Sequence, residues 1–340
     1  MTPTQPTDEP VAPPVAKPPA DAPRAPAGAF GWRDLWDSAG MLLLLVVLFV
    51  ACALLVPNFL GWNNLTGLAL SVTTVGIISC TMLLCLAAGD FDLSVGSVLA
   101  MAGVLAVVVV NATGSVLAGI VAGILAGGLV GLVNGVVIAQ LGVNALIATL
   151  ATMQIVRGVC FIISGGSAIG AASTRFYTLG NASPLGLPAP VWIMVGCFVV
   201  FGLLLHKTTF GRNTLAIGGN REAARLAGVA VTRTKIIIFT LQGIMAAFAG
   251  VIEASQMTSG QPNSGQGLEL RVISACVLGG VSLTGGVGTI MAVIVGALIM
   301  GVVQNAMDLK NVPTFYQYVA SGCILLAAVL LDRLKQRRST

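Results

Sequence analysis

Two carboxylates, Asp90 and Asp92, stand in an otherwise apolar part of the chain and are the first residues whose types suggest chemistry. In the same stretch, "AAGDFDLSVGS", Gly89 and Gly96 permit a break in a helix and Ser94 can cap the helix that follows. A charge at the middle of an apolar span costs about 2.5 to 3.5 kcal/mol, so such acids are candidates for a polar pathway or a gate. An equally open alternative is that both carboxylates only cap helix ends.

A related spacing occurs later in the chain. The pattern Gly-x-x-x-Leu-[Ser/Thr]-x-Gly runs over residues 89–96 and again over residues 279–286. The match is short and rich in glycine, and it hints at an internal repeat. We expect the two breaks to face each other across a pathway and to help gate it.

A third polar feature is Arg157, which lies about two-thirds along an apolar segment, with Gln154 three residues earlier on the same helix face. A buried guanidinium needs a partner. Asp90, Asp92 or Glu253 can supply an ion pair, or the side chain can extend to the membrane interface. A structural ion pair is favoured over contact with a substrate.

These polar residues are set in a chain of 340 residues that is 56% hydrophobic and only 9% charged. A water-soluble domain carries roughly a quarter charged residues, so an ordinary soluble fold is excluded. Apolar runs long enough to cross a bilayer of about 30 Å recur along the chain. We therefore predict an all-α, polytopic transmembrane helical bundle with about ten spans, some of them broken by glycine. The segments are 40–56, 66–88, 93–111, 115–139, 143–163, 190–206, 235–256, 270–284, 288–307 and 315–331.

Glycines shape several of these segments. The eighth segment is short, and the glycines around it predict a broken or re-entrant element, which is tolerated only where protein or water covers the backbone. The fourth segment carries Gly123, Gly127, Gly131 and Gly135 on one helix face. This ladder of small residues predicts close helix packing, which is favoured over contact with a substrate.

Basic residues predict which side of the membrane each loop faces. The loop over 206–235 holds six of them, from Lys207 to Lys235, against one glutamate, and the segment 332–340 holds four against one aspartate. By the positive-inside rule both are cytoplasmic, and ten crossings then place the N- and C-termini in the cytoplasm. The long loop over 164–189 contains only Arg175 and is expected outside.

The ends of the chain differ from its body. Residues 1–30 hold nine of the fifteen prolines, which predicts a disordered cytoplasmic tail without a secretory signal. We assign 31–333 to one transmembrane domain and 334–340 to a basic cytoplasmic tail. The net charge of +5 lies in short segments beside apolar runs, so nucleic-acid binding is a poor interpretation. The seven cysteines show neither a disulfide framework nor a metal-ligand spacing.

The cytoplasmic loop contains the stretch "GGNREAARLAGV", which predicts a short amphipathic helix hinged by glycine at both ends. Asn220 can cap this helix, Glu222 lies near the positive end of its dipole, and Gly228 stops it. A solvated surface loop is the alternative, and charge alone favours that alternative.

The order Glu-Ala-Ala-x-x-x-Gly in "EAARLAG" changes the balance, because it resembles the EAA element of ABC importer permeases. In that family the element is a coupling helix that docks in a cleft on the nucleotide-binding subunit. The resemblance implies an ATPase-coupling role for six residues: Arg221, Glu222, Ala223, Ala224, Arg225 and Gly228.

Four stretches are similar to the ribose, xylose and arabinose branch of sugar importer permeases: "LCLAAGDFDLSVGSVLAMAGV", "NALIATLATMQIVRG", "TTFGRNTLAIGGNREAARLAGV" and "ISACVLGGVSLTGGVGT". The resemblance runs from Trp32 to the C-terminal basic cluster. Three shorter stretches, "GDFDLSV", "KIIIF" and "MTSGQP", are similar to the arabinose-type members, which implies L-arabinose as the substrate.

The resemblance also implies partners and a location. It implies an inner-membrane permease that pairs with a second permease copy, usually as a homodimer, in contact with membrane lipid. A separate subunit would hold ATP and Mg, and a periplasmic sugar-binding protein would dock on the outer loops. The sequence has no Gly-x-x-x-x-Gly-Lys-[Ser/Thr] phosphate loop, so we expect no catalysis, cofactor or metal in this chain itself.

Polar groups in or beside the spans are the candidates for the translocation path or gate. Asn144 and Thr149 can hydrogen-bond sugar hydroxyls, or they can join neighbouring helices. The full set is Asp90, Asp92, Ser94, Asn144, Thr149 and Gln154.

A transporter of another class stays open as the alternative. An ion-coupled secondary transporter would use Asp90, Asp92 and Glu253 as ion sites. A channel or a purely structural membrane protein is a weaker alternative, because neither explains the coupling-like loop.

Overall fold

Long helices follow the apolar segments of the sequence, because backbone polar groups in hydrocarbon must be satisfied within the same segment. The computed structural model describes the backbone of residues 32–339 and the side chains of residues 40–330. The predicted all-α class is confirmed for this part of the chain. The long helices are α1 (Trp32–Leu55), α2 (Trp62–Ala87), α3 (Val95–Thr113), α4 (Val116–Ala139), α5 (Ala145–Ser164), α7 (Ala189–Lys207), α10 (Val231–Gln256), α12 (Ile290–Leu309) and α13 (Thr314–Ser339).

Shorter elements connect these helices. Two strands, β1 (Ile169–Gly170) and β2 (Ser259–Gly260), pair antiparallel, and α6 and α8 form within segments that the sequence assigns to loops. The N-terminal tail predicted over 1–30 lies outside the described residues. The short helices are α6 (Thr174–Asn181), the 3-10 turn η1 (Pro184–Gly186), α8 (Thr209–Gly219), α9 (Arg221–Leu226) and α11 (Leu268–Gly279).

Seven helices in the described part of the chain are long and apolar enough to cross a membrane, namely α2, α3, α4, α5, α7, α10 and α12. The apolar parts of α1 and α13 are shorter and cover Gly40–Leu55 and Thr314–Leu330. Helix α11 has only 12 residues. The prediction that the eighth segment is short is therefore confirmed, whereas the count of ten crossings stays a prediction.

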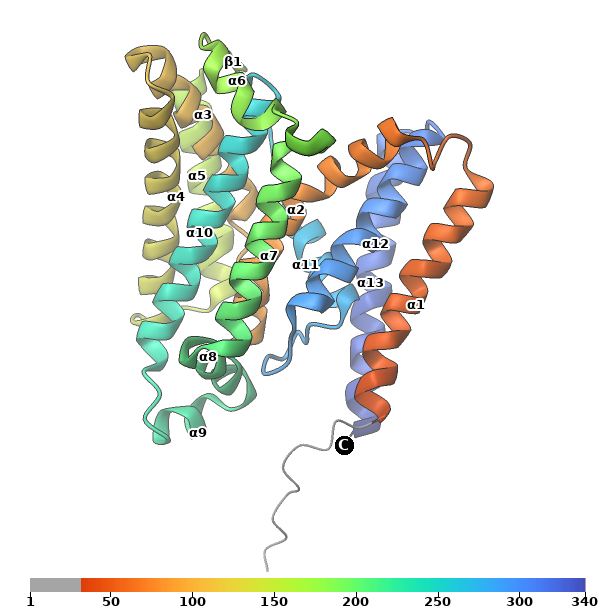
Figure 1. The fold of residues 1–340 in the computed structure, drawn as a ribbon. Coiled ribbons are helices and arrows are strands. Elements are labelled where there is room, and N and C mark those ends of the chain that lie inside the picture. The colour runs from red at the N-terminus through yellow and green to blue at the C-terminus, as the bar shows by residue number, and fades with distance from the viewer. Residues whose placement is uncertain (1–31, 340) are drawn as a thin grey trace, which may run out of the picture.

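The helices gather into two groups that α2 joins (Figure 1). One group contains α3, α4, α5, α7 and α10, and the other contains α1, α12 and α13, with α11 beside α12. Helix α2 contacts α7 and α10 in the first group and α11 and α12 in the second. At one end of the bundle lie α8, α9, the start of α1 and the end of α13, and at the opposite end lie β1 and α6.

Helix α4 packs directly on α3 and α10 because its glycines leave room for the neighbouring backbones. A Cβ atom on any of the four ladder glycines would lie closer than 3.0 Å to an atom of α3 or α10. At Gly131 that atom is the carbonyl oxygen of Phe239, so the two backbones touch without a side chain between them. The predicted small-residue ladder is confirmed as a packing surface.

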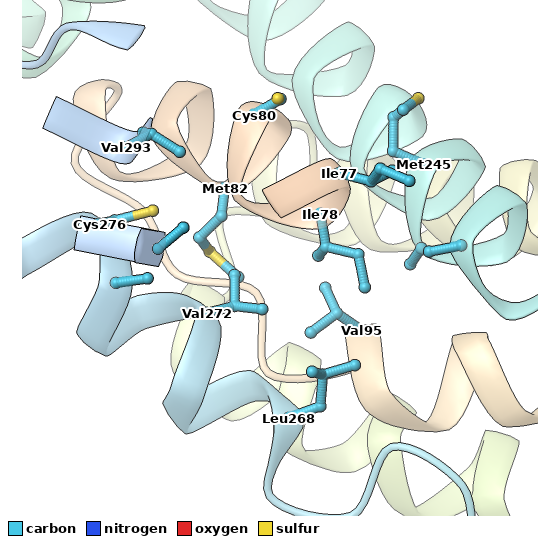
Figure 2. Packing of buried hydrophobic residues seen from close by; sticks show 14 of the residues in the cluster. Ile77, Ile78, Cys80, Met82, Val95, Met245, Leu268, Val272, Cys276 and Val293 are labelled. Atoms are coloured by element: carbon cyan, nitrogen blue, oxygen red, sulfur yellow. The ribbon is translucent and has the colours of Figure 1, made fainter. Parts of the chain in front are cut away.

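The core lies around α2. Figure 2 shows Ile78 and Met82 of α2 packed near Val95 of α3 and Val272 of α11, and all four side chains are fully buried. The outer helices differ, because large apolar side chains such as Ile162 are exposed there, in that case by 82%. Burial around α2 with apolar side chains on the outside is the pattern of a bundle surrounded by lipid rather than water.

Candidate functional site: a surface helix and two broken helices

The short helix predicted within the loop over 206–235 is present as α9. Asn220 caps it, because its Oδ1 accepts a 2.9 Å hydrogen bond from the amide of Ala223. Gly228 ends it with a φ of +84°, and the amide of Gly228 donates to the carbonyl of Arg225. Glu222 and Arg225 form an exposed ion pair with an N–O distance of 2.8 Å. The helix, its cap and its stop are confirmed.

Helix α9 packs against other helices on one face and is exposed on the other. Ala224 is buried against Ile217 of α8 and Val231 of α10. Leu226, in contrast, is 78% exposed. The inner face therefore holds α9 to two longer helices, and the outer face offers an apolar side chain next to the exposed ion pair.

Asp90 lies in the break between α2 and α3 and forms an ion pair with Lys235 near the start of α10. The Nζ of Lys235 is 2.7 Å from Oδ2 of Asp90, and the two side chains are only 7% and 12% exposed. Such a short contact is needed to offset the cost of taking both charges out of water. Asp90 therefore joins two elements instead of capping one.

Asp92 begins a chain of hydrogen bonds that crosses three helices. Its Oδ1 accepts from the amide of Ser94 at 2.8 Å and from the hydroxyl of Ser94 at 2.6 Å. The Oγ of Ser94 accepts from the Nδ2 of Asn134 in α4 at 3.1 Å. The Oδ1 of Asn134 accepts from the hydroxyl of Thr152 in α5 at 2.6 Å. Asp92 thus stabilises the start of α3 and also ties it to α4 and α5.

The two glycine-containing breaks touch each other. The amide of Gly286 donates a 2.9 Å hydrogen bond to the carbonyl of Ala87, and a Cβ atom on Gly285 would lie 3.1 Å from the Cα of Gly89. Both breaks also contact Gly218 of α8, where a Cβ atom would overlap the carbonyl of Ala87. The breaks therefore lie in direct contact, and that they face each other across a pathway and act as a gate stays a prediction.

The two breaks also contain the same local turn. In the first break, Asp92 accepts from the amide and the hydroxyl of Ser94. In the second, Ser282 holds the aligned position, and its Oγ accepts from the amide of Thr284 at 3.3 Å. The hydroxyls of Ser282 and Thr284 are hydrogen-bonded at 2.9 Å. The internal similarity predicted from spacing therefore extends to the structure of the turn.

Arg157 does not form the ion pair predicted for it within the described residues. Its Nη1 donates to the carbonyl of Pro262 at 2.6 Å and to the carbonyl of Ser264 at 2.8 Å. Both carbonyls belong to the irregular segment between β2 and α11, which has no helix to satisfy its backbone. Arg157 therefore supports irregular backbone, as bundles require wherever a helix is interrupted.

The three remaining candidates lie on or beside α5 and apart from the breaks. Asn144 is exposed and caps α5, since its Oδ1 accepts from the amide of Leu146 at 2.9 Å. Thr149 is buried, and its hydroxyl donates to the carbonyl of Ala145. Gln154 is exposed. The structure thus gathers Asp90, Asp92 and Ser94 around the first break, and it gives Asn144 and Thr149 hydrogen bonds local to α5.

Four residues of the site do not follow from the sequence pattern: Lys235, Asn134, Thr152 and Gly218. For Lys235 a signal existed, because it directly precedes the apolar run "IIIF" and a buried acid such as Asp90 requires a cation. Asn134 is the one polar side chain of α4 and Thr152 is one of several in α5, and neither reveals its partner in the sequence. Gly218 looks like any other helix-end glycine.

The comparisons with known proteins agree on one family. Residues 64–329 match the family described as branched-chain amino acid transport system / permease component. The chain is 60% identical over 313 residues to the L-arabinose transport system permease protein AraH of Escherichia coli (strain K12), over 92% of this chain and 95% of that protein. No solved structure matches the chain.

Two further relatives extend this result. The L-arabinose ABC transporter permease protein AraH of Azospirillum brasilense is 54% identical over 326 residues, which cover 95% of this chain and 96% of that protein. The ribose import permease protein RbsC of Escherichia coli (strain K12) is 40% identical over 299 residues, which cover 87% and 93%. The family match includes both breaks and α9. The chain therefore belongs to the family of membrane permeases described as branched-chain amino acid transport system / permease component.

Proposed function

We propose that this protein is the membrane-spanning subunit of an ATP-binding-cassette importer that carries L-arabinose across the inner membrane. The two relatives named for L-arabinose are 60% and 54% identical to this chain, whereas the relative named for ribose import is 40% identical. This difference supports L-arabinose over ribose as the sugar.

The observation that carries the mechanism is the geometry of α9. In this proposal α9 docks on a separate subunit that holds ATP and Mg and hydrolyses ATP, while this chain has no catalysis of its own. The exposed Leu226 and the Glu222–Arg225 pair would form the contact. Ala224, packed against α8 and α10, would transmit the motion of the ATP-binding subunit to the membrane helices.

The two breaks form the gate in this proposal. They meet each other and Gly218 at the end of the bundle where α9 lies (Figure 1). Because glycine backbones touch there directly, a shift of α8 acts on both breaks without passing through a flexible side chain. The hydrogen-bond chain from Asp92 to Thr152 would carry that shift onward to α4 and α5.

Ten crossings with both termini in the cytoplasm also belong to the proposal. Its support is that α1 begins and α13 ends at the same end of the bundle as α9 (Figure 1). The basic residues concentrate in the loop over 206–235 and after residue 331, as the positive-inside rule requires of cytoplasmic segments. Helix α11 and the irregular segment before it would together make one of the ten crossings.

At the opposite end, the loop over 164–189 would receive a periplasmic sugar-binding protein, and a second copy of the permease would complete the pathway. The loop is hydrogen-bonded to α10, because Oγ of Ser255 accepts from the amide of Gly180 at 2.7 Å and donates to the carbonyl of Phe176 at 2.5 Å. A fixed surface of this kind loses little conformational entropy when a partner binds.

An ion-coupled secondary transporter is not favoured. The family is described as a transport-system permease component, and two of the three acids named as candidate ion sites are already engaged. Asp90 is paired with Lys235, and Asp92 accepts two hydrogen bonds from Ser94. An ion site would need carboxylates free to exchange these contacts for the ion.

Competition in vesicles tests this proposal. The chain would be reconstituted with its ATP-binding subunit and sugar-binding protein, and uptake of labelled L-arabinose would be measured against excess unlabelled pentoses and hexoses. We expect unlabelled L-arabinose to suppress the signal and ribose to leave most of it. Equal suppression by ribose would refute the substrate assignment, and uptake that is unchanged without ATP would refute the importer assignment.

A further inference from the structure

Two ion pairs occur among residues 40–330, and the pair between Lys235 and Asp90 is the one of these two that joins different elements. The other pair, Arg225 with Glu222, is exposed and lies within α9. A buried ion pair is a poor source of stability, because the cost of desolvating two charges offsets most of their attraction. The position of the Lys235–Asp90 pair therefore needs an explanation other than stability.

The pair lies on one route from α9 to the first break. Ala224 of α9 packs against Val231 at the start of α10. Lys235 follows Val231 by four residues, so the two side chains lie on the same face of α10, one turn apart. The Nζ of Lys235 then contacts Asp90 in the break at 2.7 Å. Two contacts and one rigid helical turn thus separate α9 from the break.

The break has a second contact with this region, and that contact is of a different physical kind. Gly218 of α8 presses against the carbonyl of Ala87 without any side chain between them. Such packing resists compression, but it offers almost no resistance to separation. An ion pair attracts over several ångströms and resists separation, most strongly where water is excluded. The α8 contact can push the break, and the ion pair can pull it.

The backbone on both sides of Asp90 is tied to a helix, so the break can pass such a movement to α2 and to α3. Gly89 has a φ of +79°, a conformation that glycine adopts without strain, and it separates the end of α2 from Asp90. The amide of Asp90 donates a 2.9 Å hydrogen bond to the carbonyl of Cys85, so a pull on the Asp90 carboxylate also reaches the last turn of α2. On the other side of the break, Asp92 is held to Ser94 and so to α3.

We propose that the Lys235–Asp90 ion pair is a latch that makes the α2–α3 break follow α10 when α9 is moved. The latch rests on the proposed function, in which α9 is driven by an ATP-binding subunit. Both residues act as positioning residues, because their contact with each other moves the break and neither needs to touch the sugar. The latch therefore sets how much ATP is consumed for each sugar carried.

The test removes both charges together. In the double variant Asp90→Asn/Lys235→Met no uncompensated charge is left in the interior, and uncharged replacements of a buried pair are usually tolerated. The variant would be assembled with the ATP-binding subunit and the sugar-binding protein in vesicles, and ATP hydrolysis and L-arabinose uptake would be measured in the same sample. We expect assembly and hydrolysis to persist while the sugar carried per ATP falls about tenfold.

Matched variants complete the design. Arg233→Met removes an exposed cation two residues before Lys235 on α10 and should leave the ratio of sugar to ATP unchanged. The single variants Asp90→Asn and Lys235→Met are measured in the same way and should lower the ratio at least as much as the double variant. A purely structural pair predicts the opposite order, with the ratio restored in the double variant.

Each outcome decides between these accounts. A wild-type ratio in any assembled variant that lacks the pair would overturn the latch. Failure of all three variants to assemble would show that the pair is required for the fold, and the latch would also be abandoned. If the wild-type complex itself did not couple uptake to ATP hydrolysis, the proposed function would fail instead, so the two failures are distinguishable.

Discussion

Gly218 near the end of α8 lies so close to Ala87 at the end of α2 that no side chain fits between them. A Cβ atom on Gly218 would overlap the carbonyl oxygen of Ala87 and the amide nitrogen of Gly286. Gly219, the next residue, has no atom within 4 Å of the same constructed position. Two adjacent glycines in one helix therefore have opposite tolerance for a methyl group, which gives a matched pair of variants.

Gly218→Ala should impair transport far more than Gly219→Ala. The added methyl group would force α8 away from both breaks, and overpacking of this kind typically costs about 1 to 3 kcal/mol. ATP-driven uptake in vesicles, normalised to the amount of assembled complex, measures the effect. Equal uptake by the two variants would show that contact between α8 and the breaks is not needed for transport.

Leu226→Asp should weaken docking of the ATP-binding subunit without disturbing the fold, because this side chain is 78% exposed at the outer face of α9. Loss of an apolar anchor at the centre of an interface commonly costs about 2 kcal/mol or more. Co-purification of the ATP-binding subunit and stimulation of its hydrolysis are the measurements.

The control for this variant is Leu185→Asp, which changes a leucine that is 90% exposed in η1, between α6 and α7. It should leave co-purification unchanged, because it lies far from α9 along the chain and in the loop that we assign to the outer face. If both variants retained the ATP-binding subunit equally, α9 would not be the docking element.

Arg157→Met should destabilise the protein because it leaves the carbonyls of Pro262 and Ser264 without their donor. Each hydrogen bond to a charged group contributes about 1.5 to 3 kcal/mol. The free energy of unfolding in detergent should fall, and the segment before α11 should become more accessible to protease. Arg175→Met removes an exposed cation in α6 and should change neither quantity. An unchanged free energy of unfolding in Arg157→Met would show that the segment between β2 and α11 does not depend on these hydrogen bonds.

Gly131→Ala should destabilise the contact between α4 and α10, since its methyl group would overlap the carbonyl of Phe239. The expected cost is about 1 to 3 kcal/mol, typical of overpacking in a tight interior. Gly158→Ala in α5 meets no atom within 4 Å and should be neutral or stabilising by up to about 1 kcal/mol, because alanine favours helix. Thermal unfolding of the purified variants in one detergent compares the two; a melting temperature that is unchanged in Gly131→Ala would rule out backbone contact at the ladder.

Much of the fold could be predicted from the sequence because its signals are local. Apolar runs predict helices, the glycine ladder on α4 predicts a packing face, and Asn220 and Gly228 predict the two ends of α9. The shared spacing of the two breaks predicts a common turn, and that turn is found at Ser94 and at Thr284. In each case the residues that cause the structure lie within a few positions of it.

The rest depends on contacts between distant parts of the chain, which no local pattern encodes. The sequence predicts that Arg157 needs a partner. It does not predict which one, because every residue has a backbone carbonyl and nothing distinguishes those of Pro262 and Ser264. In the sequence Lys235 is one of six basic residues in the loop over 206–235, and only the fold shows that it pairs with Asp90. Which of the candidate pathway residues lie together, those at the first break or those on α5, likewise depended on the three-dimensional arrangement.

The central claim is that a separate ATP-binding subunit drives this chain through α9, and one measurement tests it most directly. The chain would be placed in sealed vesicles with the sugar-binding protein, with or without the ATP-binding subunit, and accumulation of L-arabinose against its gradient would be followed. We predict accumulation only when the ATP-binding subunit and ATP are both present, and none when α9 carries Leu226→Asp. Accumulation by the chain without that subunit would contradict the account.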